Sequence, residues 1–145
     1  MRMVLTAAAF ALLGAVAGCS SPPPPAQPEP GTLVAGTAAV TVNDADTGST
    51  DAVACTAAGP LTTITTGDAE SGSTAMVSNK GALTVESVSI RNLGGFTGSY
   101  NAGLGGEATV TMTGRTYSIE GIADGFATDQ PSFRTNGSFL IKVAC

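Results

Sequence analysis

Hydrophobic and polar residues alternate with a period of two along most of the chain from Leu33 onward. Successive side chains of a strand point to opposite faces, so this period is typical of strands with one buried face. Clusters of Gly, Asn and Asp, which favour turns, separate the alternating stretches. The pattern predicts nine strands: Leu33–Val42, Ala52–Thr56, Leu61–Thr66, Thr74–Ser78, Leu83–Arg91, Thr97–Tyr100, Ala108–Thr113, Thr116–Ile122 and Ser132–Ala144.

Two breaks in the alternation refine this prediction. Leu83 and Val85 share one face, but Val88 and Ile90 have the opposite parity, which predicts a β-bulge near Glu86. Ile122 is likewise out of phase with the residues before Gly121, which predicts a second irregularity there. The segment ADGFATDQ, residues 123–130, has no strand pattern, and we expect a loop or one short helical turn.

Residues 32–145 are 114 residues long, enough for one domain with one core. Many short strands at close spacing predict an all-β fold, either an antiparallel sandwich or a strongly curved sheet. The domain has few aromatic residues and no Trp, so small side chains such as Ala and Thr must fill much of its interior. Such a core buries less apolar area per residue, which makes any disulfide a more important source of stability.

The first 18 residues have the pattern of a signal peptide. Arg2 is the only charged residue before Glu29, and Val4–Val16 is an apolar run of 13 residues, too short for a membrane span. The run ends in Val-Ala-Gly-Cys, which resembles the lipobox of bacterial lipoproteins. That resemblance implies cleavage before Cys19 and acylation of its thiol, with two or more chains giving a stable membrane anchor. The alternative is an ordinary secretory signal with a cysteine at its cleavage site.

Residues 19–31 then form a linker in which six of the last 12 residues are proline. Proline lacks a backbone N–H and fixes φ, so this segment cannot pack as a helix or a central strand. A polyproline-like chain of that length reaches about 37 Å. We expect the linker to hold the β domain of residues 32–145 away from the lipid surface.

The chain has three cysteines. If Cys19 carries lipid, Cys55 and Cys145 remain as a pair, and export to an oxidising compartment favours a disulfide between them. Both sit in alternating stretches, from which we expect them to point inward. Two buried free thiols are the alternative.

Charge and the missing histidines exclude several classes of function. Without the leader, 5 basic residues stand against 11 acidic ones, which disfavours binding to nucleic acid or anionic lipid heads. The chain has no histidine, the commonest general base and metal ligand. Glu107, Glu120 and Asp124 would approach one another if their strands pair, but scattered carboxylates more often solvate a surface. We therefore predict no catalytic residue, no cofactor and no enzyme activity.

A calcium loop is the remaining metal hypothesis. The stretch NDADTGSTD places Asn43, Asp44, Asp46 and Asp51 around a glycine. The position eleven residues after Asp44, where a calcium loop needs a bidentate glutamate, is Cys55. An Asp-rich turn is the ordinary interpretation, and we predict no metal site.

Three stretches resemble the mycobacterial 19 kDa lipoprotein antigen family. They are VACTAAG at residues 53–59, SVSIRNLGGFTGSYNAGLGGEATVTMTGRTYSIEGIADGFA at residues 87–127, and SFRTNGSFLIKVAC at residues 132–145. The resemblance implies an acylated, palmitate-bearing cell-envelope lipoprotein without enzyme activity. It also implies a surface antigen recognised by host Toll-like receptor 2 through its acylated terminus. The linker departs from the family, whose spacer is typically rich in Thr.

These observations leave three function classes. The first is a lipid-anchored interaction protein, adhesin-like or antigenic, on the extracytoplasmic face of the cell membrane. The second is a binding module or carrier for envelope lipid or glycolipid, since a curved sheet with small inward side chains could leave a groove. The third, an enzyme, is opposed by the missing histidines. An enclosed apolar cavity would favour the second class, and a filled core would favour the first.

Overall fold

The computed structural model describes residues 18, 21–25 and 27–145, and all regular secondary structure in that part of the chain is strand. Seven strands have 5–7 residues, and β6, β9 and β10 are longer, with 10, 12 and 11 residues. In chain order they are β1 (Ala38–Val42), β2 (Ala45–Thr50), β3 (Val53–Ala58), β4 (Leu61–Gly67), β5 (Gly72–Ser78), β6 (Thr84–Leu93), β7 (Phe96–Asn101), β8 (Ala108–Thr113), β9 (Thr116–Ala127) and β10 (Arg134–Ala144).

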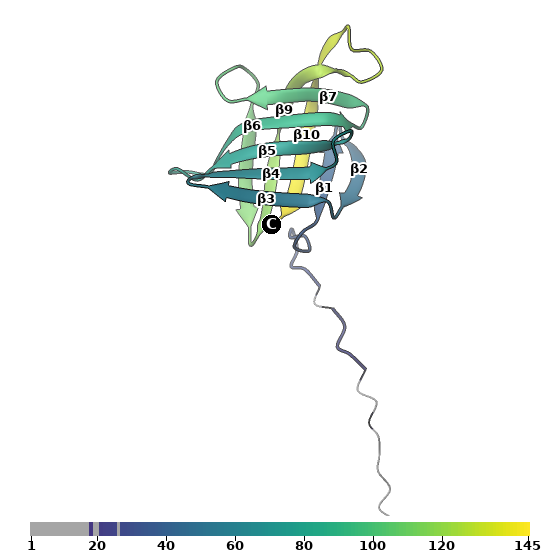
Figure 1. Cartoon of the computed structure of the whole chain (residues 1–145), viewed down its shortest axis with the longest axis vertical. Coiled ribbons are helices and arrows are strands. Elements are labelled where there is room, and N and C mark those ends of the chain that lie inside the picture. Colours follow the sequence, from purple (N-terminus) through teal and green to yellow (C-terminus); the bar gives the residue numbers. More distant parts are fainter. Residues whose placement is uncertain (1–17, 19–20, 26) are drawn as a thin grey trace, which may run out of the picture.

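All strand pairs are antiparallel and belong to one sheet, in the order β2-β1-β10-β9-β7-β6-β5-β4-β3, with β8 beside β9. The sheet is folded over into two layers (Figure 1). Strands β3 to β7 run across the front of the view, and β8, β9, β10, β1 and β2 run at a steep angle behind them. The fold is therefore a nearly closed, strongly bent antiparallel sheet.

Strand β9 joins the two layers. Its first half, up to Gly121, pairs with β8, and its last four residues pair with β7. Its other edge pairs with β10 along nearly its whole length. The long β9–β10 pair is thus the common support of both layers.

The core lies between the layers and is filled by branched aliphatic side chains with two phenylalanines, Phe96 and Phe139. One polar pair is buried among them: the hydroxyls of Thr66 and Ser73 lie 2.7 Å apart on neighbouring strands and satisfy each other. The remaining core residues are Ala38, Val40, Val42, Ile64, Ala75, Val77, Val85, Val88, Ile90, Ile119, Ala123, Ile141 and Val143.

The predicted all-β class and the bulge are confirmed. Val77 pairs with Val85 and Met76 with Ser87, so Glu86 is the extra residue in β6. The second predicted irregularity is wrong, because Ile119, Gly121 and Ala123 keep one inward parity and Ile122 faces outward with 46% of its surface exposed.

Two predictions of loop were also wrong. Residues 123–127 continue strand β9, where Gly125 faces inward. A Cβ there would collide with the backbone of Thr97 on β7, so this strand position requires glycine and carries no apolar signal. Residues 45–50 form β2, an exposed edge strand whose sequence ADTGST has no hydrophobic face to detect.

Candidate functional site

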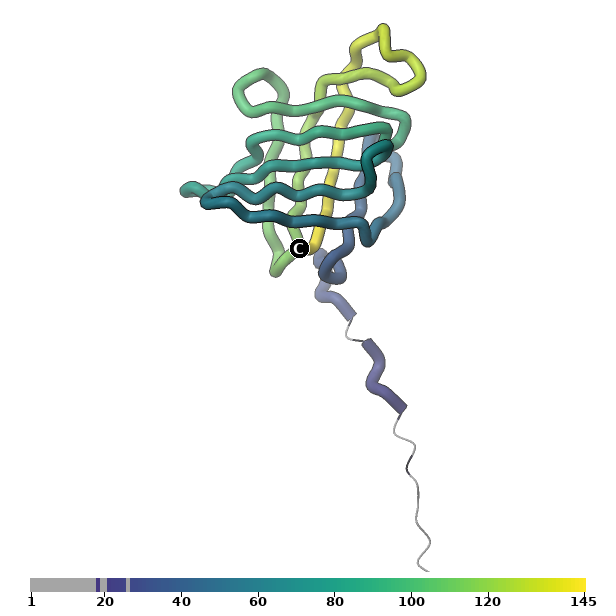
Figure 2. The backbone as a smooth tube through the Cα atoms, viewed as in Figure 1, coloured from purple at the N-terminus to yellow at the C-terminus, as the bar shows by residue number. Residues whose placement is uncertain are grey.

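The N-terminal segment attaches at one end of the domain. The backbone N–H of Leu33 donates to the hydroxyl oxygen of Thr116 at 3.0 Å, and that of Gly36 donates to the carbonyl of Ala144 at 2.8 Å. Residues 21–25 and 27–31 have exposed side chains and lead away from the strands (Figure 2). Residues 1–17 of the predicted leader and the predicted lipid-bearing Cys19 lie outside the described residues.

The predicted cysteine pair is confirmed. Cys55 on β3 and Cys145 after β10 form a disulfide with their Cα atoms 6.0 Å apart, 90 residues apart in the chain. The expected inward orientation is wrong for Cys55, which is exposed, whereas Cys145 is half-buried against the core. The bond lies at the surface because β3 is an edge strand, and it ties that edge of the front layer to the end of the back layer.

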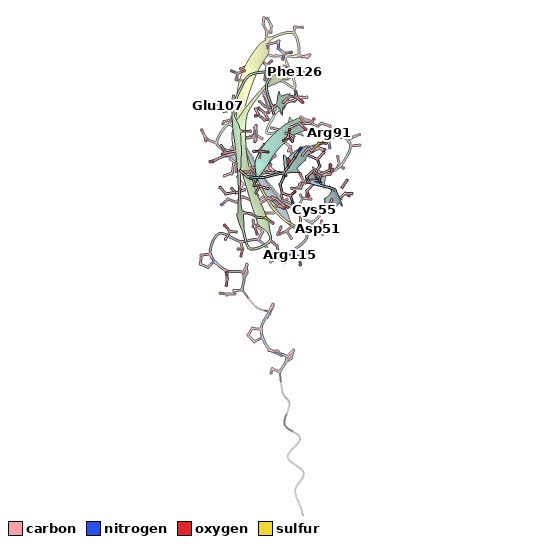
Figure 3. The ribbon with its side chains drawn as sticks, turned by 90° about the vertical axis from the view of Figure 1, so that its left-hand side faces the viewer. Asp51, Cys55, Arg91, Glu107, Arg115 and Phe126 are labelled. Carbon is pink, nitrogen blue, oxygen red and sulfur yellow. A yellow bond between two sulfur atoms is a disulfide. The ribbon has the colours of Figure 1, made fainter. Side chains whose placement is uncertain are left out.

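Two of the three carboxylates considered above line the same hollow. Thr109 of β8 pairs with Glu120 of β9, and the backbone N–H of Ile122 donates to the carbonyl of Glu107 at 2.9 Å. Glu107 and Glu120 therefore line the same hollow of about 420 Å³, on the outer face of the back layer. Figure 3 shows Glu107 on the opposite side of the domain from Cys55.

The third predicted carboxylate, Asp124, lies elsewhere. It forms an exposed ion pair with Arg134 of β10, which compensates its charge. A different acid, Asp44, takes its place beside the two glutamates. Asp44 belongs to the two-residue turn between β1 and β2, whose residues Asn43 and Asp44 both have positive φ, at 50° and 62°.

That turn is fixed to β10 by a pair of hydrogen bonds. The backbone N–H of Asn43 donates to the carbonyl of Ser138 at 2.9 Å, and the Asn43 side-chain oxygen accepts from the N–H of Ser138 at 3.1 Å. Positive φ at both central residues matches the tight hairpin turns for which Asn and Asp are suited. The Asp-rich stretch is thus a hairpin, and it positions Asp44 at the hollow.

The calcium hypothesis has no support in this geometry. Asp46 accepts a hydrogen bond from the backbone N–H of Gly48 at 2.8 Å, an ordinary turn contact. Across the described ranges, no group of three or more Asp, Glu or Cys side chains lies close enough to hold a metal ion. In the same part of the chain there is no helix long and apolar enough to cross a membrane.

One carboxyl has a shifted pKa. Asp68, in the turn between β4 and β5, accepts hydrogen bonds from the backbone N–H groups of Ser71 at 2.8 Å and Glu70 at 2.9 Å. These bonds favour the charged form and lower the pKa of Asp68 below its ordinary 3.8, with a smaller contribution from the charge of Arg91. The Arg91 guanidinium also donates to the Asp68 carbonyl at 3.0 Å.

Sequence reasoning missed the apolar part of the hollow. Leu140 and the outward Ile122 lie among its lining residues, and Ile122 also lines a second hollow of about 390 Å³ with Leu104, which is 84% exposed. Strict alternation along β9 from the inward Ile119 would have placed Ile122 on the outward face. That alternation is the signal that could have found it. A separate hollow of about 560 Å³ lies between β6 and β8, where it is lined by Leu83, Val85, Tyr100, Ala108 and Val110, which belong to the core or pack against it. A groove beside inward side chains, which a curved sheet could leave, is therefore present as well.

The chain is similar to known mycobacterial proteins. The family model described as Mycobacterium 19 kDa lipoprotein antigen matches residues 31–145. A protein of Mycobacterium indicus pranii, named as an inferred lipoprotein, is 40% identical over 143 residues, covering 98% of this chain and 93% of the relative. Lipoprotein LpqH of Mycobacterium tuberculosis strain H37Rv is 33% identical over 107 residues, covering 73% of this chain and 67% of the relative. LpqH of Mycobacterium avium is 32% identical over 107 residues, covering 73% and 66%. The chain belongs to the mycobacterial 19 kDa lipoprotein antigen family.

Proposed function

We propose that the protein is a lipid-anchored lipoprotein that displays its β domain on the extracytoplasmic face of the cell envelope. The observation that carries this proposal is the disulfide between Cys55 and Cys145. It accounts for two of the three cysteines and is typical of an oxidising, extracytoplasmic compartment. Cys19 is then the cysteine available for acylation, at the end of a sequence with the lipobox pattern.

The proposed arrangement has three parts: a leader of residues 1–18, an acylated Cys19 with a linker to residue 31, and the β domain of residues 32–145. The family match, which begins at residue 31, supports the last boundary. The linker leaves the domain at the end where Arg115 lies (Figure 3). The opposite end, with the loop after β7 and the loop between β9 and β10, would then face away from the membrane.

We further propose that the anchor and the domain have separate roles. The acylated terminus would be the ligand of host Toll-like receptor 2, because a diacylated cysteine carries that determinant without a folded domain. The domain would present a surface to partners in the envelope or in the host. The two hollows on the outer face open to solvent and do not enclose a cavity, which supports a display role over the alternative of a carrier that encloses lipid.

Cys19→Ala tests the anchor. We expect the variant to stay unprocessed or to leave the membrane fraction, and intact mass spectrometry to find no acyl chains on it. Ser21→Ala, two residues along, is the matched control and should be processed and fractionated like the wild type. A Cys19→Ala protein that fractionates and migrates like its parent would contradict the proposed anchor.

A cell assay tests the division of roles. The acylated protein is compared at equal concentration with the same mature chain exported behind an ordinary secretory signal with Cys19 replaced by Ala. We expect receptor stimulation from the acylated form alone, with the same β-rich circular dichroism for both. Equal stimulation by both forms would show that the folded domain is itself the ligand.

A further inference from the structure

Two neighbouring hollows on the outer face of the back layer share an aliphatic residue. Leu140 and Ile122 lie in the hollow of about 420 Å³, and Ile122 and Leu104 lie in the neighbouring one of about 390 Å³. Ile122 is therefore shared by both hollows, which together form one groove across strands β9 and β10 and the loop after β7. We call these two joined hollows the outer groove. Half-exposed aliphatic side chains in a concave surface are typical of interaction sites.

The outer groove has an acidic rim. Asp44, Glu107 and Glu120 line its first hollow, and no Lys or Arg is among the residues lining either hollow. Asp124 lines the second hollow, where Arg134 compensates its charge. Asp44, Glu107 and Glu120 form no ion pair within 4 Å in the described part of the chain. Three such carboxylates beside Ile122 and Leu140 favour a ligand that is both cationic and apolar.

The backbone that carries the rim is held in place before any ligand arrives. Asn43 fixes the turn of Asp44 to β10 through its two bonds with Ser138. The carbonyl of Glu107 accepts from Ile122, and Glu120 lies within the β9 ladder. A groove with a fixed backbone loses little conformational entropy on binding, which raises its affinity for a given contact area.

We propose that the outer groove binds an extended segment of a partner protein in which every second residue is basic or aliphatic, so that both kinds of side chain point to the same face. The aliphatic groups would cover Ile122 and Leu140, and the basic groups would face the three carboxylates. Hydroxyls of Thr41, Thr109 and Ser138 in the groove lining can bond to peptide backbone. The acidic rim disfavours the anionic heads of lipids. The linker of this chain does not fit the groove either, because residues 20–31 contain one acid and no base.

The test uses the mature chain of residues 19–145 with Cys19 replaced by Ala, exported behind an ordinary secretory signal and purified without detergent, and a fluorescent heptapeptide, N-acetyl Lys-Ser-Leu-Ser-Lys-Ser-Leu amide. Fluorescence anisotropy is expected to show saturable binding that weakens as salt rises, because exposed charge pairs are screened. Glu120→Gln and Glu107→Gln should each weaken binding about two- to fivefold, the range expected for surface ion pairs. Ile122→Asn should weaken binding about tenfold, because the exposed half of the Ile122 side chain no longer provides apolar area for the peptide to bury.

Matched variants distinguish binding in the outer groove from non-specific effects of net charge and surface hydrophobicity. Glu70→Gln removes an exposed acid far along the sheet, and Met112→Asn removes a side chain that is 48% exposed, close to the 46% of Ile122. Both should bind the peptide like the wild type. Since Ile122, Glu107 and Glu120 are exposed, circular dichroism of all variants should be unchanged.

Three results would overturn the proposal. The first is equal binding of the acidic peptide Glu-Ser-Leu-Ser-Glu-Ser-Leu, and the second is an equal loss of binding with the control variants. The third is displacement of the peptide by phosphatidylcholine vesicles or by a second copy of the chain at rising protein concentration, which would assign the groove to lipid or to self-association. None of these outcomes depends on acylation of Cys19, so the anchor and the groove fail or stand separately.

Discussion

The two ends of the domain hold their layers together by different means. At the end near the linker, the Cys55–Cys145 disulfide joins the edge strand β3 to the end of β10. The Arg115 guanidinium adds a bond of 2.6 Å to the carbonyl of Cys145. At the opposite end, the ring of Phe96 lies between the layers and is 2% exposed.

At the far end, the packing of Phe96 requires glycine at two neighbouring positions. A Cβ on Gly137 would lie 2.7 Å from the ring of Phe96, and one on Gly98 would lie 2.6 Å from it. The ring therefore occupies a slot that two glycines of different strands leave open. A disulfide holds two strands together even where its surroundings are exposed and loosely packed. An aromatic ring between two glycines stabilises the fold only if every neighbouring residue leaves it room. The linker end should thus tolerate substitution and the far end should not.

The largest expected effect is at the far end. Phe96→Ala should lower the free energy of unfolding by about 3–5 kcal/mol, because it removes a buried ring and leaves a cavity. Urea denaturation measures the change. Phe133→Ala, at a phenylalanine that is 72% exposed, is the control and should stay within about 0.5 kcal/mol of the wild type. Similar losses for both would contradict the view that the slot holds this end together.

The slot itself can be tested by combining substitutions. Gly137→Ala should destabilise the wild type strongly, since its new methyl group meets the ring of Phe96. The same change should cost less in the Phe96→Ala background, where the ring is gone. This coupling, measured as a double-mutant cycle, is the signature of direct contact. Additive effects would place the cost of Gly137→Ala elsewhere.

The next effect is at the linker end. Replacing Cys55 and Cys145 together by Ser should cost about 2–4 kcal/mol, because the unfolded chain loses a cross-link that closes a long loop. Hydrogen exchange should rise mainly in β3, β4 and the last residues of β10, and protection of β7 and β9 should persist. Ala54→Ser, at an exposed neighbour of Cys55, should leave both measurements unchanged. Equal loss of protection at both ends would remove the distinction between them.

The sequence predicts the linker end better than the far end, for a physical reason. Cysteine parity and the apolar face of FLIKVAC are local signals, and they indicate both the disulfide and β10. The slot around Phe96 depends on which glycines the topology brings beside the ring, and a glycine carries no hydrophobic pattern. Strand β9 was cut short for the same reason, because its inward Gly125 matches no strand signal.

The candidate groove shows a similar division. The sequence allowed Glu107, Glu120 and Asp124 to approach one another if their strands pair, and the first two line one hollow. Asp44 was assigned to a turn, which is correct, but its place on the rim follows from the bonds between Asn43 and Ser138, 95 residues apart. Contacts at such separations follow from topology, which alternation along one chain does not encode.

The smallest expected effect is at the β4–β5 turn, between the two ends of the domain. It tests whether the charge of Asp68 stabilises the fold. Because the folded-state pKa of Asp68 is below the ordinary 3.8, the charged carboxylate stabilises the fold above that pH. This contribution should be lost as the pH falls below 3.8 and through the lowered folded-state pKa. Asp68→Asn keeps one oxygen for the N–H groups of Ser71 and Glu70 but removes the charge. The difference in unfolding free energy between wild type and variant, from urea titrations at successive pH values, should therefore be constant near neutrality and shrink in acid. A difference that stays constant down to the lowest pH would show that hydrogen bonding by either side chain suffices and that the charge of Asp68 adds nothing to the turn.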